Sequence, residues 1–180
     1  MNYRNLCHGT TKEAAINILE TGFRFSPAHG TWCGEGIYFY DVEAKALWFA
    51  QRTCRKSSSS TPAIVYADIL NIGRNDVVDL RTYADARDFQ NIVTQLLADK
   101  RFTIDGVENE TERIITLRAL LIGYYAKYKR KKLVIGNYRQ RFQPNDMGLI
   151  NELNIVLGVE TIYCVKDASI LQNIRMMEVN

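Results

Sequence analysis

The distribution of β-prone and helical segments along the chain is the feature that most constrains its fold. Short β-prone runs gather toward the two ends of the sequence, at 3–8, 37–40, 63–70, 77–80, 133–135, 161–165 and 174–179. Between them, 89–97 and 109–128 carry apolar residues at helical spacing. Because strands and helices are segregated rather than strictly alternating, the pattern predicts an α+β fold.

Capping signals predict where several helices begin and end. Thr10 has the spacing of a capping box ahead of a helix that Gly22 would end. Asp41 precedes a second predicted helix that runs to about residue 55, and Asn109 precedes the long helix of the middle region. The hydrophobic content of 47% over 180 residues suits one folded domain spanning 1–180, with 81–130 as a helical insertion.

Composition excludes some classes of function. The four cysteines show no CxxC spacing, and only two histidines accompany them, so we expect no metal site and free thiols of a cytoplasmic protein. The start MNYRNLCHGT lacks an apolar run of signal-peptide length, and no stretch approaches 18 apolar residues. We therefore expect no contact with a membrane.

Three short motifs follow one another in the first fifty residues. They are HGT at 8–10 at the end of a β-prone run, GEGIYF at 34–39, and the aromatic pair WF at 48–49 on the next predicted helix. In this order and spacing they resemble the catalytic domain of diphtheria-toxin-like ADP-ribosyltransferases, the group that includes the poly(ADP-ribose) polymerases. The resemblance is close over 6–50 and looser over 159–179. It implies two packed antiparallel-type sheets that form an NAD cleft with flanking helices.

The resemblance also implies roles for individual residues. His8 would bind the adenosine ribose of NAD⁺, and the backbone of Gly9 would bind the nicotinamide carboxamide, with Thr10 completing this cofactor-binding motif. Tyr38 and Phe49 would stack on the two faces of the nicotinamide. A flat cation between two rings gains apolar burial together with cation–π attraction.

Two positions depart from the family pattern. The serine that often bonds the carboxamide is replaced by Ala46, which removes one hydrogen bond worth roughly 1 kcal/mol. The glutamate that many members use to support the oxocarbenium charge aligns with Ile162. Glu160, two residues earlier on the same predicted strand face, is a candidate catalytic residue, and Glu152 is a third alternative.

Several mono-ADP-ribosylating relatives carry a hydrophobic residue at this third position. The resemblance therefore implies a mono-ADP-ribosyltransferase that uses NAD⁺ as substrate, without a metal, and modifies a protein or nucleic acid. An intracellular toxin, with a cognate antitoxin protein as partner, or a phage-defence effector fits these features. The alternatives are an NAD or ADP-ribose sensor module without transfer activity and an NAD glycohydrolase.

A basic stretch at 127–141 is the strongest charge feature of the chain. It holds seven Lys or Arg residues and no acid, namely Lys127, Lys129, Arg130, Lys131, Lys132, Arg139 and Arg141. Such a run is either a solvated face or a surface that meets the phosphates of a nucleic-acid acceptor such as RNA. The sequence leaves both interpretations open.

Overall fold

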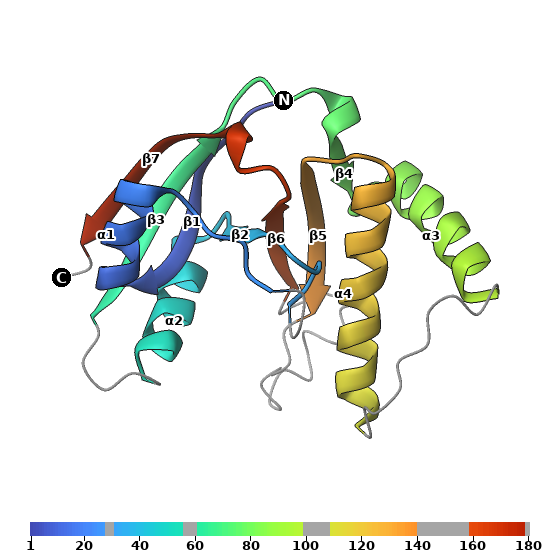
Figure 1. Cartoon of the computed structure of the whole chain (residues 1–180), viewed down its shortest axis with the longest axis horizontal. Helices are drawn as coiled ribbons and strands as arrows, with labels where there is room; N and C mark the ends of the chain where they lie inside the picture. The colour runs from blue at the N-terminus through green and yellow to red at the C-terminus, as the bar shows by residue number, and fades with distance from the viewer. Residues whose placement is uncertain (28–30, 56–60, 99–108, 140–158, 179–180) are drawn as a thin grey trace, which may run out of the picture.

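The computed structural model describes residues 1–27, 31–55, 61–98, 109–139 and 159–178, and within them seven strands and four α-helices (Figure 1). The strands are β1 (Tyr3–Thr11), β2 (Ile37–Tyr40), β3 (Pro62–Ile69), β4 (Val77–Asp79), β5 (Leu133–Arg139), β6 (Val159–Val165) and β7 (Leu171–Glu178). The helices are α1 (Lys12–Thr21), α2 (Glu43–Cys54), α3 (Tyr83–Ala98) and α4 (Glu110–Tyr128). The predicted α+β class is confirmed.

The described strands form one sheet in the order β4-β5-β6-β2-β1-β3-β7. All its neighbours are antiparallel except β4 and β5. Strand β2 joins the group β1, β3 and β7 to the group β4, β5 and β6, and its pairing with β1 consists of Cys7 opposite Tyr40 (Figure 1). The two halves are thus held together by a narrow junction. The division into two packed sheets stays a prediction.

The helices cover the sheet in a way that explains the apolar runs of the sequence. On β3, Val65 packs with residues of α1, whereas Ile64 and Tyr66 pack with Ala46 of α2. Strand β3 is therefore buried on both faces, as its near-continuous apolar run 63–70 requires. Helix α4 covers the other half of the sheet, where Ile122 and its neighbours pack on β5 and β6.

The predicted helix ends are partly correct. Gly22 ends α1 with a φ of 85°, and the Asn109 side chain caps α4 by accepting from the amides of Thr111 and Glu112. Helix α1, however, is capped by Thr11 rather than Thr10, because β1 continues through both threonines in its pairing with β3. The prediction of a cap by Asp41 is also wrong, since Val42 precedes α2 without a side-chain cap.

Helices α3 and α4 occupy the segment 81–130 in which the helical insertion was expected. They pack against each other through the edge-to-face rings of Phe89 and Tyr125, 5.3 Å apart. The hydroxyl of Tyr125 donates a 2.6 Å hydrogen bond to Asp88 of α3. No helix among the described residues is both long and apolar enough to cross a bilayer.

Candidate functional site

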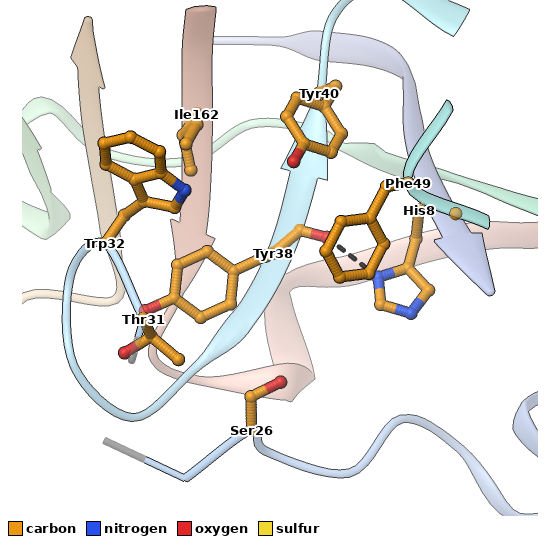
Figure 2. A pocket seen from close by; sticks show the side chains of 9 residues that line it. His8, Ser26, Thr31, Trp32, Tyr38, Tyr40, Phe49 and Ile162 are labelled. Carbon is orange, nitrogen blue, oxygen red and sulfur yellow. Dashed lines mark hydrogen bonds between the residues drawn. The ribbon is translucent and has the colours of Figure 1, made fainter. Parts of the chain in front are cut away.

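A cleft lies where β1, β2, β6 and α2 meet the loop that precedes β2 (Figure 2). Its walls are largely aromatic. The residues that line it are His8, Gly9, Ser26, Thr31, Trp32, Tyr38, Tyr40, Phe49 and Ile162. The structure thus brings together five of the residues predicted from sequence to bind NAD⁺, from elements up to 154 residues apart in the chain, counted from His8 to Ile162.

Tyr38 presents its ring to the cleft because its hydroxyl is held elsewhere. That hydroxyl donates to the carbonyl oxygen of Gly34 and accepts a 3.1 Å hydrogen bond from the amide of Cys33. Burial raises the pKa of Tyr38, so the hydroxyl remains protonated at neutral pH. Phe49 reaches the same cleft from α2 and is 42% exposed. Both rings line the cleft, and an aromatic face can stack on a flat ligand.

His8 is fixed in one tautomer by its neighbours. Its Nδ1 lies 2.8 Å from the carbonyl oxygen of Tyr38, drawn as a dashed line in Figure 2. A carbonyl can only accept, so Nδ1 carries the proton and Nε2 remains as an acceptor. The rings of Phe23 and Phe39 pack against the imidazole at 5.3 and 5.7 Å. Burial lowers the pKa of His8, which keeps the ring neutral at pH 7.

Gly9 is required by the packing of β1 on α2. A Cβ placed on Gly9 would lie 1.9 Å from the carbonyl oxygen of Ala46, which no side chain can occupy. Ala46 itself is fully buried, so the residue that departs from the family pattern forms part of this contact. Thr10, which the sequence places beside Gly9 in the cofactor-binding motif, is not among the residues that line the cleft.

The loop that precedes β2 forms a further wall that the sequence analysis missed. Reciprocal backbone hydrogen bonds between Ser26 and Gly36, of 2.9 and 3.3 Å, close its base. Gly34 has a φ of 79°, and a Cβ there would lie 2.7 Å from the carbonyl oxygen of Ala119 on α4. The loop therefore rests directly on α4 and brings Trp32 to the cleft.

Arg118 of α4 contacts both the ring and the backbone of Trp32. Its guanidinium lies 4.4 Å from the centre of the indole, and its Nε donates a 3.2 Å hydrogen bond to the Trp32 carbonyl. The same guanidinium lies 5.4 Å from the ring of Tyr138 on β5. Helical spacing on α4 gives no signal for this contact, because the two residues lie 86 positions apart.

The structure separates two of the three candidates for the third catalytic position. Ile162 lines the cleft and pairs across the sheet with Tyr40 of β2. Glu160 lies beyond the lining residues, with 12% of its side chain exposed, and forms a 3.1 Å ion pair with Lys45 of α2. Glu152 lies outside the described residues.

Two buried thiols lie beneath the aromatic wall. Cys33 and Cys164 are fully buried, and the Sγ of Cys33 is 3.0 Å from the hydroxyl of Tyr138. Lys166 donates to the carbonyl oxygens of Cys33, at 2.7 Å, and of Glu35. All four cysteines are free thiols, as the sequence predicted. The described part of the chain contains no group of three His, Cys, Asp or Glu residues suited to a metal ion.

Part of the basic stretch is already engaged in local contacts. Lys129 forms a 2.9 Å ion pair with Asp88, and Lys131 donates a 2.6 Å hydrogen bond to the carbonyl of Asn75. Arg141 and the side chain of Arg139 lie outside the described part of the structure.

A family model of known proteins matches the part of the chain that supplies most of the cleft residues. The family model described as the poly(ADP-ribose) polymerase catalytic domain matches residues 1–102 of the 180, which span β1 to α3 and include His8, Gly9, Tyr38 and Phe49. No curated protein matches the chain. Catalytic domains of this family use NAD⁺ as substrate. The chain therefore belongs to the poly(ADP-ribose) polymerase catalytic domain family and is an NAD⁺ ADP-ribosyltransferase.

Proposed function

We propose that this protein transfers a single ADP-ribose unit from NAD⁺ to a macromolecular acceptor. The observation that carries the proposal is the composition of the cleft, in which His8, Tyr38 and Phe49 share one site with the apolar Ile162. The first three provide contacts for NAD⁺, whereas Ile162 offers no carboxylate to activate a second ADP-ribose as acceptor. Chain growth is therefore disfavoured relative to a single transfer.

The reaction breaks the bond between C1′ of the ribose and the nicotinamide nitrogen. The bonding electron pair leaves with nicotinamide, which becomes neutral, and positive charge develops on the ribose. A nucleophile of the acceptor then forms a bond to C1′ and releases its proton to solvent. Stacking between Tyr38 and Phe49 would hold the nicotinamide ring, and the unprotonated Nε2 of His8 would accept from a hydroxyl of the adenosine ribose.

In this proposal Glu160 stabilises the positive charge that develops on the ribose, although it lies outside the cleft lining and is paired with Lys45. A carboxylate near the developing charge lowers the barrier even when it does not touch the ribose, because the cleft excludes part of the solvent. Lys45 opposes this effect by neutralising Glu160. The opposing effects of Glu160 and Lys45 should moderate the rate of transfer. In this proposal the protein acts as a cytoplasmic toxin or phage-defence effector, with an antitoxin protein as its partner.

The acceptor is proposed to be a protein or a nucleic acid, and one experiment addresses the reaction and the acceptor together. The purified protein is incubated with NAD⁺ labelled in the adenine, alone and with whole-cell protein or RNA. Release of nicotinamide with label on the macromolecule is the expected result. Release with only free ADP-ribose would identify a glycohydrolase, and binding without release would identify a sensor module.

A further inference from the structure

Three polar groups of the cleft are already engaged in hydrogen bonds within the protein. The Tyr38 hydroxyl bonds to the loop, and the Thr31 hydroxyl donates a 3.0 Å hydrogen bond to the carbonyl of Gly34. Nδ1 of His8 bonds to the Tyr38 carbonyl. Tyr40 differs from these, because its side chain is half-buried and its hydroxyl forms no hydrogen bond with any described residue. A half-buried hydroxyl of this kind normally has a partner.

The position of Tyr40 follows from the alternation of side chains along β2 and from the pairing of β2 with β6. Tyr38 and Tyr40 are two residues apart on β2, so both rings lie on the face of the sheet that borders the cleft. Across the ladder, Tyr40 is the direct partner of Ile162. Its hydroxyl points into the space bounded by Ile162, Tyr38 and Phe49 (Figure 2).

Burial, and after it a nearby carboxylate, favours the protonated form of the Tyr40 hydroxyl. Burial and, after it, the nearby carboxylate of Glu160 raise the pKa of Tyr40 to about 12, with Arg52 acting in the opposite direction. Glu160 is in turn held on this side by Lys45. At neutral pH the phenol is therefore a hydroxyl that can both donate and accept.

We propose that the Tyr40 hydroxyl binds the 2′-hydroxyl of the nicotinamide ribose and is a catalytic residue of this site. The inference rests on the proposed function, in which the nicotinamide lies between Tyr38 and Phe49. The ribose attached to that ring extends along the same wall, where Ile162 supplies only apolar surface and Tyr40 supplies the polar contact. Tyr40 orients the ribose without adding a charge.

A binding cycle with non-cleavable ligands tests this contact. The probe is carba-NAD⁺, in which a methylene replaces the ring oxygen of the nicotinamide ribose, together with its analogue lacking the 2′-hydroxyl on that ring. Both are titrated by calorimetry into the wild type, Tyr40→Phe and the matched control Tyr83→Phe, which removes the hydroxyl of a tyrosine that is 79% exposed on α3.

We expect Tyr40→Phe to weaken binding of carba-NAD⁺ about fivefold, the equivalent of one neutral hydrogen bond, and to leave binding of the deoxy analogue unchanged. Tyr83→Phe should change neither affinity. Equal losses for the two ligands, or no loss for either, would overturn the contact.

The same titrations separate this inference from the proposed function. A wild-type protein that binds carba-NAD⁺ but releases no nicotinamide from NAD⁺ is not a transferase, yet the difference between the two analogues still reports on Tyr40. A wild-type protein that binds neither analogue has no NAD⁺ site in this cleft, and both proposals then fail. Thermal melting of Tyr40→Phe within a few degrees of the wild type establishes that the variant is folded.

Discussion

The two walls of the cleft are built in different ways. The motif wall consists of His8, Gly9, Tyr38 and Phe49, which come from β1, β2 and α2 within a span of 42 residues counted inclusively. The distal wall consists of Trp32 and Ile162, with Arg118 stacked on the indole and Glu160 two residues before Ile162 on β6. The family match covers all of the motif wall, whereas Ile162, Glu160 and Arg118 lie beyond residue 102.

The difference is also one of chemistry. The motif wall is neutral, with its polar groups fixed by backbone hydrogen bonds such as that between His8 and the Tyr38 carbonyl. The distal wall carries charges, a cation on Trp32 and an ion pair next to Tyr40. We expect the motif wall to hold NAD⁺ and therefore to tolerate little change. We expect the charged residues of the distal wall, Arg118 and Glu160, to tolerate substitution better, because neither lines the cleft.

The strongest test of the motif wall is His8→Asn. Asparagine can still donate to the Tyr38 carbonyl but has no group in place of Nε2, so the support of β2 is kept and the contact to ribose is lost. We expect loss of activity by about 10²-fold or more, the order found when one preorganised contact to the transition state is removed. Nicotinamide release, measured beside the melting temperature, checks this. Wild-type turnover in the variant would show that His8 does not bind NAD⁺ in the reaction.

Replacing Tyr38 separates its ring from its hydroxyl. Tyr38→Ala removes the stacking surface and should weaken NAD⁺ binding at least tenfold, more than Tyr38→Phe does. Both changes also remove the hydroxyl that bonds Gly34 and Cys33, so both should destabilise the fold, by about 1–3 kcal/mol. Calorimetry with NAD⁺ and thermal melting measure the two effects. Equal losses of affinity in the two variants would mean that the hydrogen bonds of the Tyr38 hydroxyl to Gly34 and Cys33, rather than stacking of the ring, govern NAD⁺ binding.

The contribution of Glu160 sharpens the description of the distal wall. Because Glu160 lies outside the cleft lining and is paired with Lys45, we expect Glu160→Gln to lower turnover about tenfold, less than His8→Asn does. Lys45→Met leaves the carboxylate unneutralised and should raise turnover relative to the wild type. Single-turnover rates of nicotinamide release distinguish the variants. A loss of 10²-fold or more in Glu160→Gln would make Glu160 the direct third residue in place of Ile162.

The sequence predicted the motif wall more fully than the distal wall for a physical reason. Strand β2 follows from its local β-prone pattern, and the helix caps at Gly22 and Asn109 follow from local capping signals. The cleft residues of β1 were identified by their resemblance to a contiguous family motif. Tyr40 could also have been found, because it shares a strand face with Tyr38.

Other features depend on contacts that no local pattern records. The sequence predicts a strand at 133–135, but β5 continues to Arg139 because its ladder with β6 stabilises Gly136 and Asn137, which have weak β-propensity. The stacking of Arg118 on Trp32 joins residues 86 positions apart. Tertiary packing thus assembled the part of the site that the sequence left open.

The smallest expected effect concerns the acceptor and the basic stretch. Replacing Arg130, Lys131 and Lys132 with Glu reverses three charges just after α4, none of which belongs to a residue that lines the cleft. If the acceptor is RNA or DNA, these charges meet phosphates, and modification should fall severalfold at low salt while affinity for NAD⁺ is unchanged. Lys131 already bonds to the Asn75 carbonyl, so we expect fewer than three phosphate contacts to be lost.

The salt dependence of acceptor binding measures the number of contacts directly. Each phosphate contact contributes about 0.7 to 0.9 to the slope of log affinity against log salt, so the triple variant should show a slope lower by about 1 to 2. A protein acceptor would show a weaker and less regular dependence on salt. A triple variant that modifies its acceptor normally at both low and high salt would remove the basic stretch from acceptor recognition, and the search for the acceptor surface would then move to the charged residues of the distal wall.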